Sequence, residues 1–372
     1  MTFDDLPSIS FVDTDAANIE AAVITMYEGI TSRSLAQGDP VRLFLQAMAA
    51  IIIQQRILIN ESAKQNLLAY AQGHVLDHMG ALVGVNRLGA SAAQTRIRFT
   101  LSAVQPQAVT IPAGIRGTTA NGVGFQVANP IAIPAGSLAG DAPAVCILTG
   151  TIGNGYVPGQ INQLVDPLPW IQSIANITDS EGGAEPEDDD AYRERIRQAP
   201  EKYSVAGPEG AYRFWAMSAN QNIVDVSVRS PSPGVVELRP LLKNGEIPGT
   251  EILDTVLESV GNKKVRPLTD QVIALPPESV SYDVNLTYYI DKDNITQTAA
   301  IQQAAAKAVN DYNLWQKTMM GRSINPTELI WRLRAAGASR VEVALPEFLA
   351  LEKYQVAQVN TVAVGFGGIS DG

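Results

Sequence analysis

The stretch from residue 91 to residue 178 constrains the fold of this 372-residue chain most, because it is almost free of charge. It is rich in Gly, Pro, Thr and Val and holds five charged residues. These are Arg96, Arg98, Arg116, Asp141 and Asp166. In "TRIRFTLSA" the apolar residues alternate with polar ones, which is the period of a half-buried strand.

Further short strands are predicted by the segments "VTIPAG", "FQVANP", "AIPAG", "AVCILTG" and "INQLV", which Pro and Gly turns separate. The alternation in the first strand places Ile97, Phe99 and Leu101 on one face. The tetrapeptide IPAG occurs twice, which does not establish a repeat. We predict a β-rich sandwich or barrel-like middle domain over 91–178. We also expect an assembled partner to shield its strand edges.

The first 90 residues read as an N-terminal helical region. Asp15 is a candidate N-cap for a helix that reaches Ile30. A long helix is predicted from Val41 to Ala71, and at about 1.5 Å per residue it would measure on the order of 45 Å. Its apolar residues recur with the spacing of a packed helical seam. These candidate interaction residues are Val41, Leu45, Met48, Ile52 and Ile59. The helix has few charges, which favours burial by its own domain or by a partner.

Residues 179–372 alternate between helices and strands and predict a C-terminal α+β region. Strands are expected at 223–229, 235–242, 271–275, 280–290, 340–344 and 359–365. Helices are expected at 189–198, 251–260 and 298–316, and another opens at the cap sequence Asn325-Pro326. The whole chain is therefore expected to be a multidomain α+β protein with boundaries after about residues 90 and 178.

The segment "YRERIRQAPEKYSVAGPEGAYRFWA" is predicted to form two helices with a break between them. Pro200 prevents one continuous rod, and Gly207 with Pro208 restarts the helix along a new axis. We predict that this segment is a structural joint, and that Gly207→Val hinders assembly. A second structural glycine, Gly234, ends the turn sequence "SPSPG" between two strands.

Composition excludes several classes of function. The formal charge of −11 argues against broad binding to nucleic acid or to an anionic membrane. The single Cys146 excludes an intrachain disulfide and fits a reducing cytoplasm. No basic N-terminal signal is visible, and the longest apolar run, Ala47 to Ile53, is shorter than the roughly 20 residues of a spanning helix. We expect a soluble protein with no nucleic-acid or membrane partner.

Candidate chemistry is sparse. His74 and His78 have i, i+4 spacing with Asp77 nearby, but no third metal ligand is apparent, which favours an ordinary helix terminus. The acidic run over 185–190 lacks the pattern of a calcium loop, and acids that precede a helix are favoured by its dipole. Phosphate-loop and nucleophile-elbow motifs are absent from the sequence. We predict no catalytic residues, no cofactor and no metal.

A family resemblance covers at least residues 182–290. The segments "GGAEPEDDDAYRERIRQAPEKYSVAGPEGAYRFWAMSA", "VDVSVRSPSPGVVELRPLLKNG" and "VRPLTDQVIALPPESVSYDVNLTYYI" closely resemble the baseplate J-like family. These proteins are wedge subunits of the baseplate in contractile-tailed phages and related particles. In the region before them, "GASAAQTRIRF", "VTIPAGIRGTT" and "GTIGNGYVPGQI" resemble the β-region of the longer members.

The resemblance implies a non-enzymatic, structural role in the tail baseplate of a virion that assembles in the host cytoplasm. It implies self-association, with two or more copies per wedge, and contacts with other wedge proteins, the central hub, the tail tube and sheath-proximal proteins. It also implies that the long helix joins an inter-subunit bundle and that the C-terminal region forms a ring. The alternative is a β-rich adhesin or receptor-binding component, and a cell-wall hydrolase is disfavoured by the lack of an acid/base pair.

Overall fold

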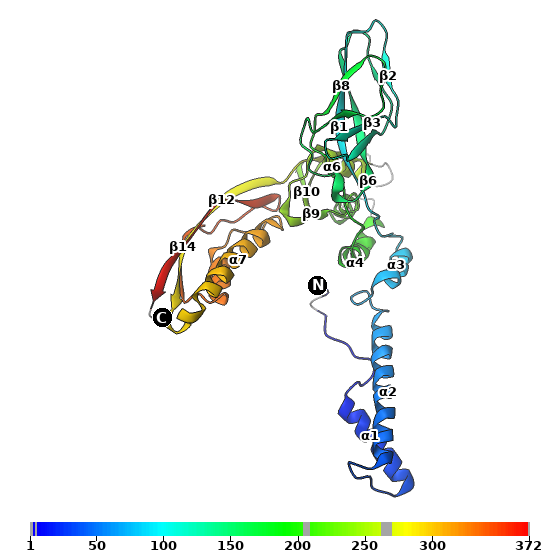
Figure 1. Cartoon of the computed structure of the whole chain (residues 1–372), viewed down its shortest axis with the longest axis vertical. Coiled ribbons are helices and arrows are strands. Elements are labelled where there is room, and N and C mark those ends of the chain that lie inside the picture. The colour runs from blue at the N-terminus through cyan, green and yellow to red at the C-terminus, as the bar shows by residue number, and fades with distance from the viewer. Residues whose placement is uncertain (1–2, 4–5, 204–208, 262–269, 371–372) are drawn as a thin grey trace. The chain divides into compact units, whose positions relative to one another are not determined.

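The computed structural model describes residues 3, 6–203, 209–261 and 270–370. The chain forms two compact units. The helical unit comprises Met1–Arg87 and Asp188–Ile196, and the main unit comprises Leu88–Glu187 and Arg197–Gly372. Figure 1 shows N-terminal helices, a barrel-like sheet and a C-terminal α+β region, which confirms the expected fold class. The expected domain boundaries after residues 90 and 178 stay a prediction.

The helical unit begins with two capped helices. Its helices are α1 (Ala16–Thr31), α2 (Pro40–Lys64), α3 (Gly73–Leu82) and α4 (Asp189–Gln198), the last of which ends in the main unit. Asp15 caps α1 by accepting a hydrogen bond from the Asn18 N–H, as expected. Asp39 caps α2 in the same way, and Pro40 occupies the first helical position. Both helix starts are therefore set by local sequence.

The end of α2 differs from its expected position. The helix stops at Lys64, so the prediction that it continues to Ala71 is wrong. The side chain of Gln65 stabilises a turn there, because its amide donates to the Tyr70 carbonyl at 3.3 Å and its oxygen accepts from the Gln72 N–H at 3.0 Å. At about 1.5 Å per residue, α2 is roughly 37 Å long.

Helix α4 packs against the residues around α3. Its buried Tyr192 donates from its hydroxyl to the Val85 carbonyl at 2.8 Å. Gly80 in α3 leaves the space for this ring, because a Cβ at that position would overlap the Tyr192 hydroxyl. Two arginines of α4, Arg193 and Arg195, donate to loop carbonyls that helices alone would leave unpaired. The acidic run before α4 thus leads into a densely hydrogen-bonded element.

The main unit opens with a nearly closed barrel. Its six-stranded sheet has the order β7-β3-β4-β6-β1-β8, beside a two-stranded sheet of β2 and β5. The strands are β1 (Ala92–Leu101), β2 (Val109–Ile111), β3 (Arg116–Thr119), β4 (Gly124–Val127), β5 (Ile131–Ile133), β6 (Ala139–Thr149), β7 (Ile161–Leu164) and β8 (Ile171–Asn176). A short 3₁₀ helix, η2 (Thr151–Gly153), follows β6. Ile97, Phe99 and Leu101 are buried in the barrel core, as the alternation predicts.

Asn176 closes the barrel between its two end strands. Its buried side chain accepts from the Ile161 N–H of β7 at 2.9 Å and donates to the Val157 carbonyl at 3.0 Å. The end strands β7 and β8 lie next to each other, so the sheet is nearly closed. The expectation that an assembled partner shields the strand edges stays a prediction.

The barrel charges are neutralised in pairs. Arg98 and Arg116 each form a two-pronged ion pair, with Asp141 and Asp166 respectively, and Arg96 contacts Asp254 at 3.2 Å. The hydrogen bonds from Arg98 and from Arg116 lower the pKa of the Asp141 and Asp166 carboxyls. All five charges of the 91–178 stretch therefore have an ionic partner.

Two α+β modules follow the barrel. The first, here the central module, contains α5 (Glu209–Met217), β9 (Ile223–Ser232), β10 (Val235–Leu242), α6 (Thr250–Val260) and β11 (Gln271–Ala274), with sheet order β11-β10-β9. The C-terminal module contains β12 (Glu278–Asp291), α7 (Thr298–Lys317), α8 (Pro326–Ala335), β13 (Arg340–Leu345) and β14 (Gln355–Ser370), with order β13-β12-β14. Short 3₁₀ helices are η3 (Ala199–Tyr203), η4 (Lys243–Gly245) and η5 (Lys292–Gln297).

Each module pairs one antiparallel and one parallel neighbour with its middle strand. In Figure 1, α7 lies along the sheet of the C-terminal module. The expected apolar stripe of α7 faces this sheet, with Ile301, Ala305 and Tyr312 buried. Asn325 caps α8 by accepting from the Thr327 N–H at 3.0 Å, as expected.

Candidate assembly interface

The helix pair α1–α2 carries a large amount of uncovered apolar surface. One face of α2 shows Phe44, Ile51 and Leu58 at 63%, 53% and 61% exposure. These residues recur every seven positions and so form one stripe, here the outer stripe. Within α1 and α2 the buried residues are few, namely Ile19, Ile24, Ala49 and Asn60. Apolar side chains on this scale are normally covered in the functional state.

A groove of about 510 Å³ runs between the two helices. Its wall is apolar, with one acid and one arginine at the rim. The lining residues are Asp13, Asn18, Ile19, Ala22, Val23, Met26, Tyr27, Ile30, Leu45, Ile52 and Arg56. Met26 and Ile30 lie at 69% and 79% exposure, so the groove is open to solvent. Its shape and lining suit the apolar face of another helix.

Polar side chains fix the helix pair in place. Gln46 of α2 donates to Glu20 of α1 at 2.7 Å. The buried Asn60 accepts from the N–H groups of Phe11 and Val12 and donates to the Val12 carbonyl, so it holds the segment before α1 against α2. These bonds hold α1 and the segment before it against α2, and the outer stripe lies outside this contact.

The five expected interaction residues lie on one face of α2 but differ in exposure. Val41, Leu45 and Ile52 are half-buried, whereas Met48 and Ile59 are exposed at 41% and 49%. Leu45 and Ile52 line the groove against α1.

The outer stripe of Phe44, Ile51 and Leu58 was not identified from the sequence. Because α2 is apolar around most of its circumference, spacing alone cannot say which face α1 covers. The scarcity of charges indicated that the helix as a whole is a contact element, but it did not indicate which face makes the contact.

Helix α2 also has the length and composition to cross a membrane. It is the one such helix in the described part of the chain, with a mean hydropathy of 1.4 over an 18-residue window that is 11% buried. A helix that a protein partner covers has the same two properties. The expected absence of a membrane partner stays a prediction.

Only some of the predicted joint residues lie in the described part of the chain. Gly207 and Pro208 lie outside the described residues, while Pro200 lies in η3 and is exposed. The chain passes from the helical unit to the main unit between Ile196 and Arg197, close to this break. Gly234 lies between β9 and β10 with a backbone φ of 77°, the left-handed region that favours glycine. The role of these residues as a joint stays a prediction.

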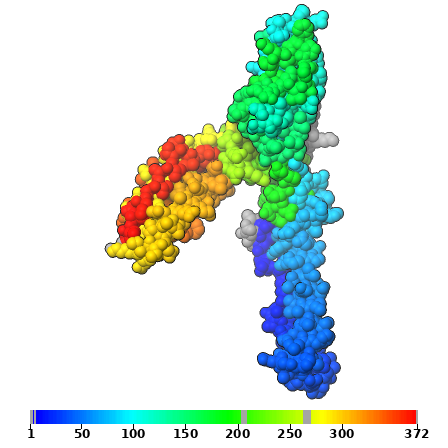
Figure 2. All heavy atoms as spheres, in the orientation of Figure 1, coloured from blue at the N-terminus to red at the C-terminus, as the bar shows by residue number. Residues whose placement is uncertain are grey.

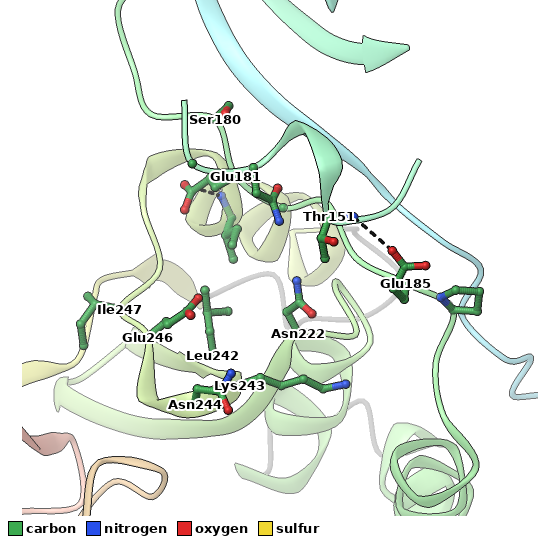
Figure 3. A pocket seen from close by; sticks show the side chains of 15 residues that line it. Thr151, Ser180, Glu181, Glu185, Asn222, Leu242, Lys243, Asn244, Glu246 and Ile247 are labelled. Carbon is green, nitrogen blue, oxygen red and sulfur yellow. Dashed lines mark hydrogen bonds between the residues drawn. The ribbon is translucent and has the colours of Figure 1, made fainter. Parts of the chain in front are cut away.

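A polar cavity of about 640 Å³ lies where the barrel meets the central module (Figure 3). Glu181 projects from the barrel side and caps α6, accepting from the N–H groups of Gly249 at 2.8 Å and Glu251 at 3.0 Å. Burial raises the pKa of Glu181. Glu185 accepts from the Thr151 N–H at 3.3 Å on the opposite wall. These carboxylates thus hold structural elements together.

The histidines are exposed on α3. His74 lies 3.4 Å from the carboxylate of Asp77, and His78 is also exposed. Among the described residues, no group of three or more His, Cys, Asp or Glu side chains is placed to hold a metal ion. Asp189 of the acidic run accepts from the Gly73 N–H at 3.0 Å, and this hydrogen bond lowers the pKa of the Asp189 carboxyl.

The described residues thus present ordered modules with uncovered apolar surface, which is the character of a subunit of a larger assembly. Comparison with known proteins agrees. Models of the baseplate J-like N-terminal, barrel, central and C-terminal domains match residues 37–94, 96–183, 204–276 and 284–365. The chain belongs to the baseplate J-like family.

Two relatives and one solved structure illustrate the similarity. Baseplate protein J of Escherichia phage P2 is 34% identical over 161 residues, which is 43% of this chain and 52% of that protein. The uncharacterized protein YqbT of Bacillus subtilis is 26% identical over 199 residues, 51% of this chain and 52% of that protein. The chain spans about half the length of these relatives. A chain of the anti-feeding prophage baseplate has a TM-score of 0.40 and 14% identity, with 93% of this chain and 90% of that chain covered.

Proposed function

We propose that this chain is a structural subunit of the baseplate wedge in a contractile phage tail or a related injection particle. It assembles around the central hub and links neighbouring wedges. Its partners are further copies of itself, other wedge proteins, and proteins of the hub, tail tube and sheath-proximal region. It assembles in the host cytoplasm, acts in the baseplate of the virion, and has no catalytic activity.

The observation that carries this proposal is the uncovered apolar surface of α1 and α2. Family membership points to the baseplate. The helix pair supplies the physical reason for a partner, because the outer stripe and the α1–α2 groove offer two apolar faces of one rigid element. Helices of another wedge protein would bury these faces and complete a bundle.

The test is a binding experiment with the neighbouring tail proteins. The chain is co-expressed with the products of adjacent tail genes, and complexes are purified and sized. In the variant Phe44→Lys/Leu58→Lys we expect recovery of the complex to fall at least about tenfold, since two charges would be buried at the interface. The variant chain should keep its melting temperature, because both side chains are exposed.

A matched variant separates lost apolar contact from added charge. Gln54→Lys adds a positive charge at an exposed polar position of the same helix. We expect this variant to bind within about twofold of the unchanged chain. Equal binding by all three proteins would contradict a role for α2 in assembly.

A second candidate function, receptor binding, has one observation in its favour. Trp170 between β7 and β8 is 58% exposed and has a backbone φ of 69°, which is uncommon for a bulky residue. It borders a groove of about 390 Å³ together with Pro106 and Pro169. Binding of the purified chain to host cells, lost in Trp170→Ala, would support this candidate, whereas binding to tail proteins alone would oppose it.

A further inference from the structure

Strand β14 is a long edge strand that carries no charged residue and no proline. It pairs in parallel with β12 and is the last strand of its sheet. Every residue from Asn360 to Gly367 is exposed. Edge strands normally carry charged residues or Pro, which prevent pairing with another chain. The sequence of β14, QVAQVNTVAVGFGGIS, contains neither. The red strip in Figure 2 shows β14 at the surface of the C-terminal module.

The side chains of β14 extend the apolar core of the module into solvent. Val362, Val364 and Phe366 lie opposite the core residues Val284, Leu286 and Tyr288 of β12 and therefore on the same face. The three β12 residues are at most 5% exposed, whereas the three β14 residues are 38–49% exposed. Helix α7 contacts β14, and Val356 and Ala357 near the start of this strand are buried, but the middle of the strand is left open to solvent.

The open segment is symmetrical in length and in side-chain size. Register irregularities between Tyr282 and Val284 and between Tyr288 and Ile290 bound a regular run in the exposed part of β14, from Val362 to Phe366 and centred on Val364. In an antiparallel pair of two such runs, Val362 would oppose Phe366, Ala363 would oppose Gly365, and Val364 would oppose its own counterpart. Large residues would then meet on one face and small ones on the other.

The charges around this run favour a second copy over a partner of different sequence. A strand that pairs with itself across a twofold axis places like charges close together, and β14 carries none. A nearby carboxylate, that of Asp283, accepts hydrogen bonds from Asn360 and from Thr361 at 3.0 and 2.6 Å. These bonds lower the pKa of Asp283, with Thr361 contributing most. The run therefore lacks the charges by which another protein would be selected.

We infer that β14 pairs antiparallel with β14 of a second copy of this chain, with the twofold axis at Val364. The two C-terminal modules then share one six-stranded sheet in the order β13-β12-β14-β14-β12-β13. The inference rests on the proposed function, because it specifies how neighbouring copies meet in the baseplate.

Cysteine cross-linking tests the register directly. The one native cysteine, Cys146, is buried in the barrel, so an introduced thiol gives a clean signal. Opposed residues in an antiparallel pair have Cα atoms about 4.5–5.5 Å apart, within the range of a disulfide. We expect oxidised Val364→Cys chains to run mainly as dimers on a non-reducing gel. The neighbouring Ala363→Cys lies two residues from its counterpart and should give at least about tenfold less dimer.

The experiment is done on the full chain, purified and in particles formed with the neighbouring tail proteins. Equal dimer yields at the two positions, or none in particles, would overturn the inference. As a second measurement, Val364→Lys should abolish dimers in light scattering while the melting temperature stays within about 2 °C, since the side chain is exposed in the monomer. If that variant remains dimeric, the edge is not the contact.

Failure of the inference is distinguishable from failure of the proposed function. Recovery of the chain in baseplate complexes without a Val364→Cys dimer would retain the proposed function and reject the strand pairing. A Val364→Cys dimer in a chain that never enters such complexes would retain the pairing and reject the baseplate role.

Discussion

At the residue scale, Gly234 shows why a turn predicted from the sequence needs a glycine. The turn sequence "SPSPG" predicted a break between two strands, and the structure extends β9 to Ser232 and leaves Pro233 and Gly234 as the turn. The φ of 77° at Gly234 is strained for any residue with a Cβ. Local sequence was sufficient here because the turn depends on one glycine.

We expect Gly234→Val to destabilise the chain by at least about 1 kcal/mol, since a β-branched residue resists the left-handed conformation. Differential scanning calorimetry should show a melting temperature lower by roughly 2–4 °C for each kcal/mol lost. Gly89→Val is the control, because Gly89 has open space around it and no positive φ. An unaltered melting temperature in Gly234→Val would refute the requirement.

At the scale of helices and strands, some elements were predictable from sequence patterns and others were not. Helix caps and the two-residue period of β1 were predictable because they depend on neighbours in the chain. Strands β3 and β8 were missed, since each is short and lacks a clear alternation. The two IPAG segments gain a meaning only in three dimensions. Each begins at the last residue of one of the paired strands β2 and β5, where its Ile is buried, and turns at a glycine with positive φ, Gly114 or Gly136.

The closure of the barrel supplies a second prediction. Asn176→Ala would leave the buried Ile161 N–H without its partner and would remove the hydrogen bond to the partly buried Val157 carbonyl. Unsatisfied buried groups cost about 1–3 kcal/mol each, so we expect a loss of about 2–4 kcal/mol in unfolding free energy. The exposed Asn162, which donates to the Gly159 carbonyl, provides the control variant Asn162→Ala. Denaturant titration measures both, and equal stabilities would argue against closure by Asn176.

The scale of the whole molecule adds contacts that no local pattern predicts. Glu237 of β10 is buried between Arg229 and Arg239, and both guanidinium groups lie over the ring of Tyr354, at 4.1 and 5.4 Å. Tyr354 directly precedes β14 and lies more than a hundred residues further along the chain. This cluster joins the central and C-terminal modules, and its members could not be grouped from the sequence.

The same cluster predicts a pH dependence. Burial would raise the pKa of Glu237, but hydrogen bonds from Arg229 and Arg239 outweigh it and lower the pKa below the usual range. A carboxyl with a lowered folded pKa stabilises the fold above its unfolded pKa, about 4.3, and loses that contribution as pH falls through the folded value. We expect the melting temperature to be steady from about pH 7 to 5 and to drop below about pH 4.

The variant Glu237→Gln measures how much of this pH dependence comes from the Glu237 carboxylate. Removing one partner of a buried ionic cluster should cost about 2–4 kcal/mol at neutral pH, less than for a fully buried pair because Arg229 is partly exposed. The difference from the unchanged chain should shrink on acidification, because protonated Glu237 loses the same ion pairs. Calorimetry at several pH values measures it, and a constant difference at all pH values would contradict the assignment.

The outer stripe of α2 also has a consequence for the newly made chain. A newly made chain carries Phe44, Ile51 and Leu58 in water until another protein meets it. Proteases and self-aggregation compete for chains in that interval. We therefore expect the half-life of the free chain to be short, and we expect co-expression with a protein that covers this stripe to lengthen it.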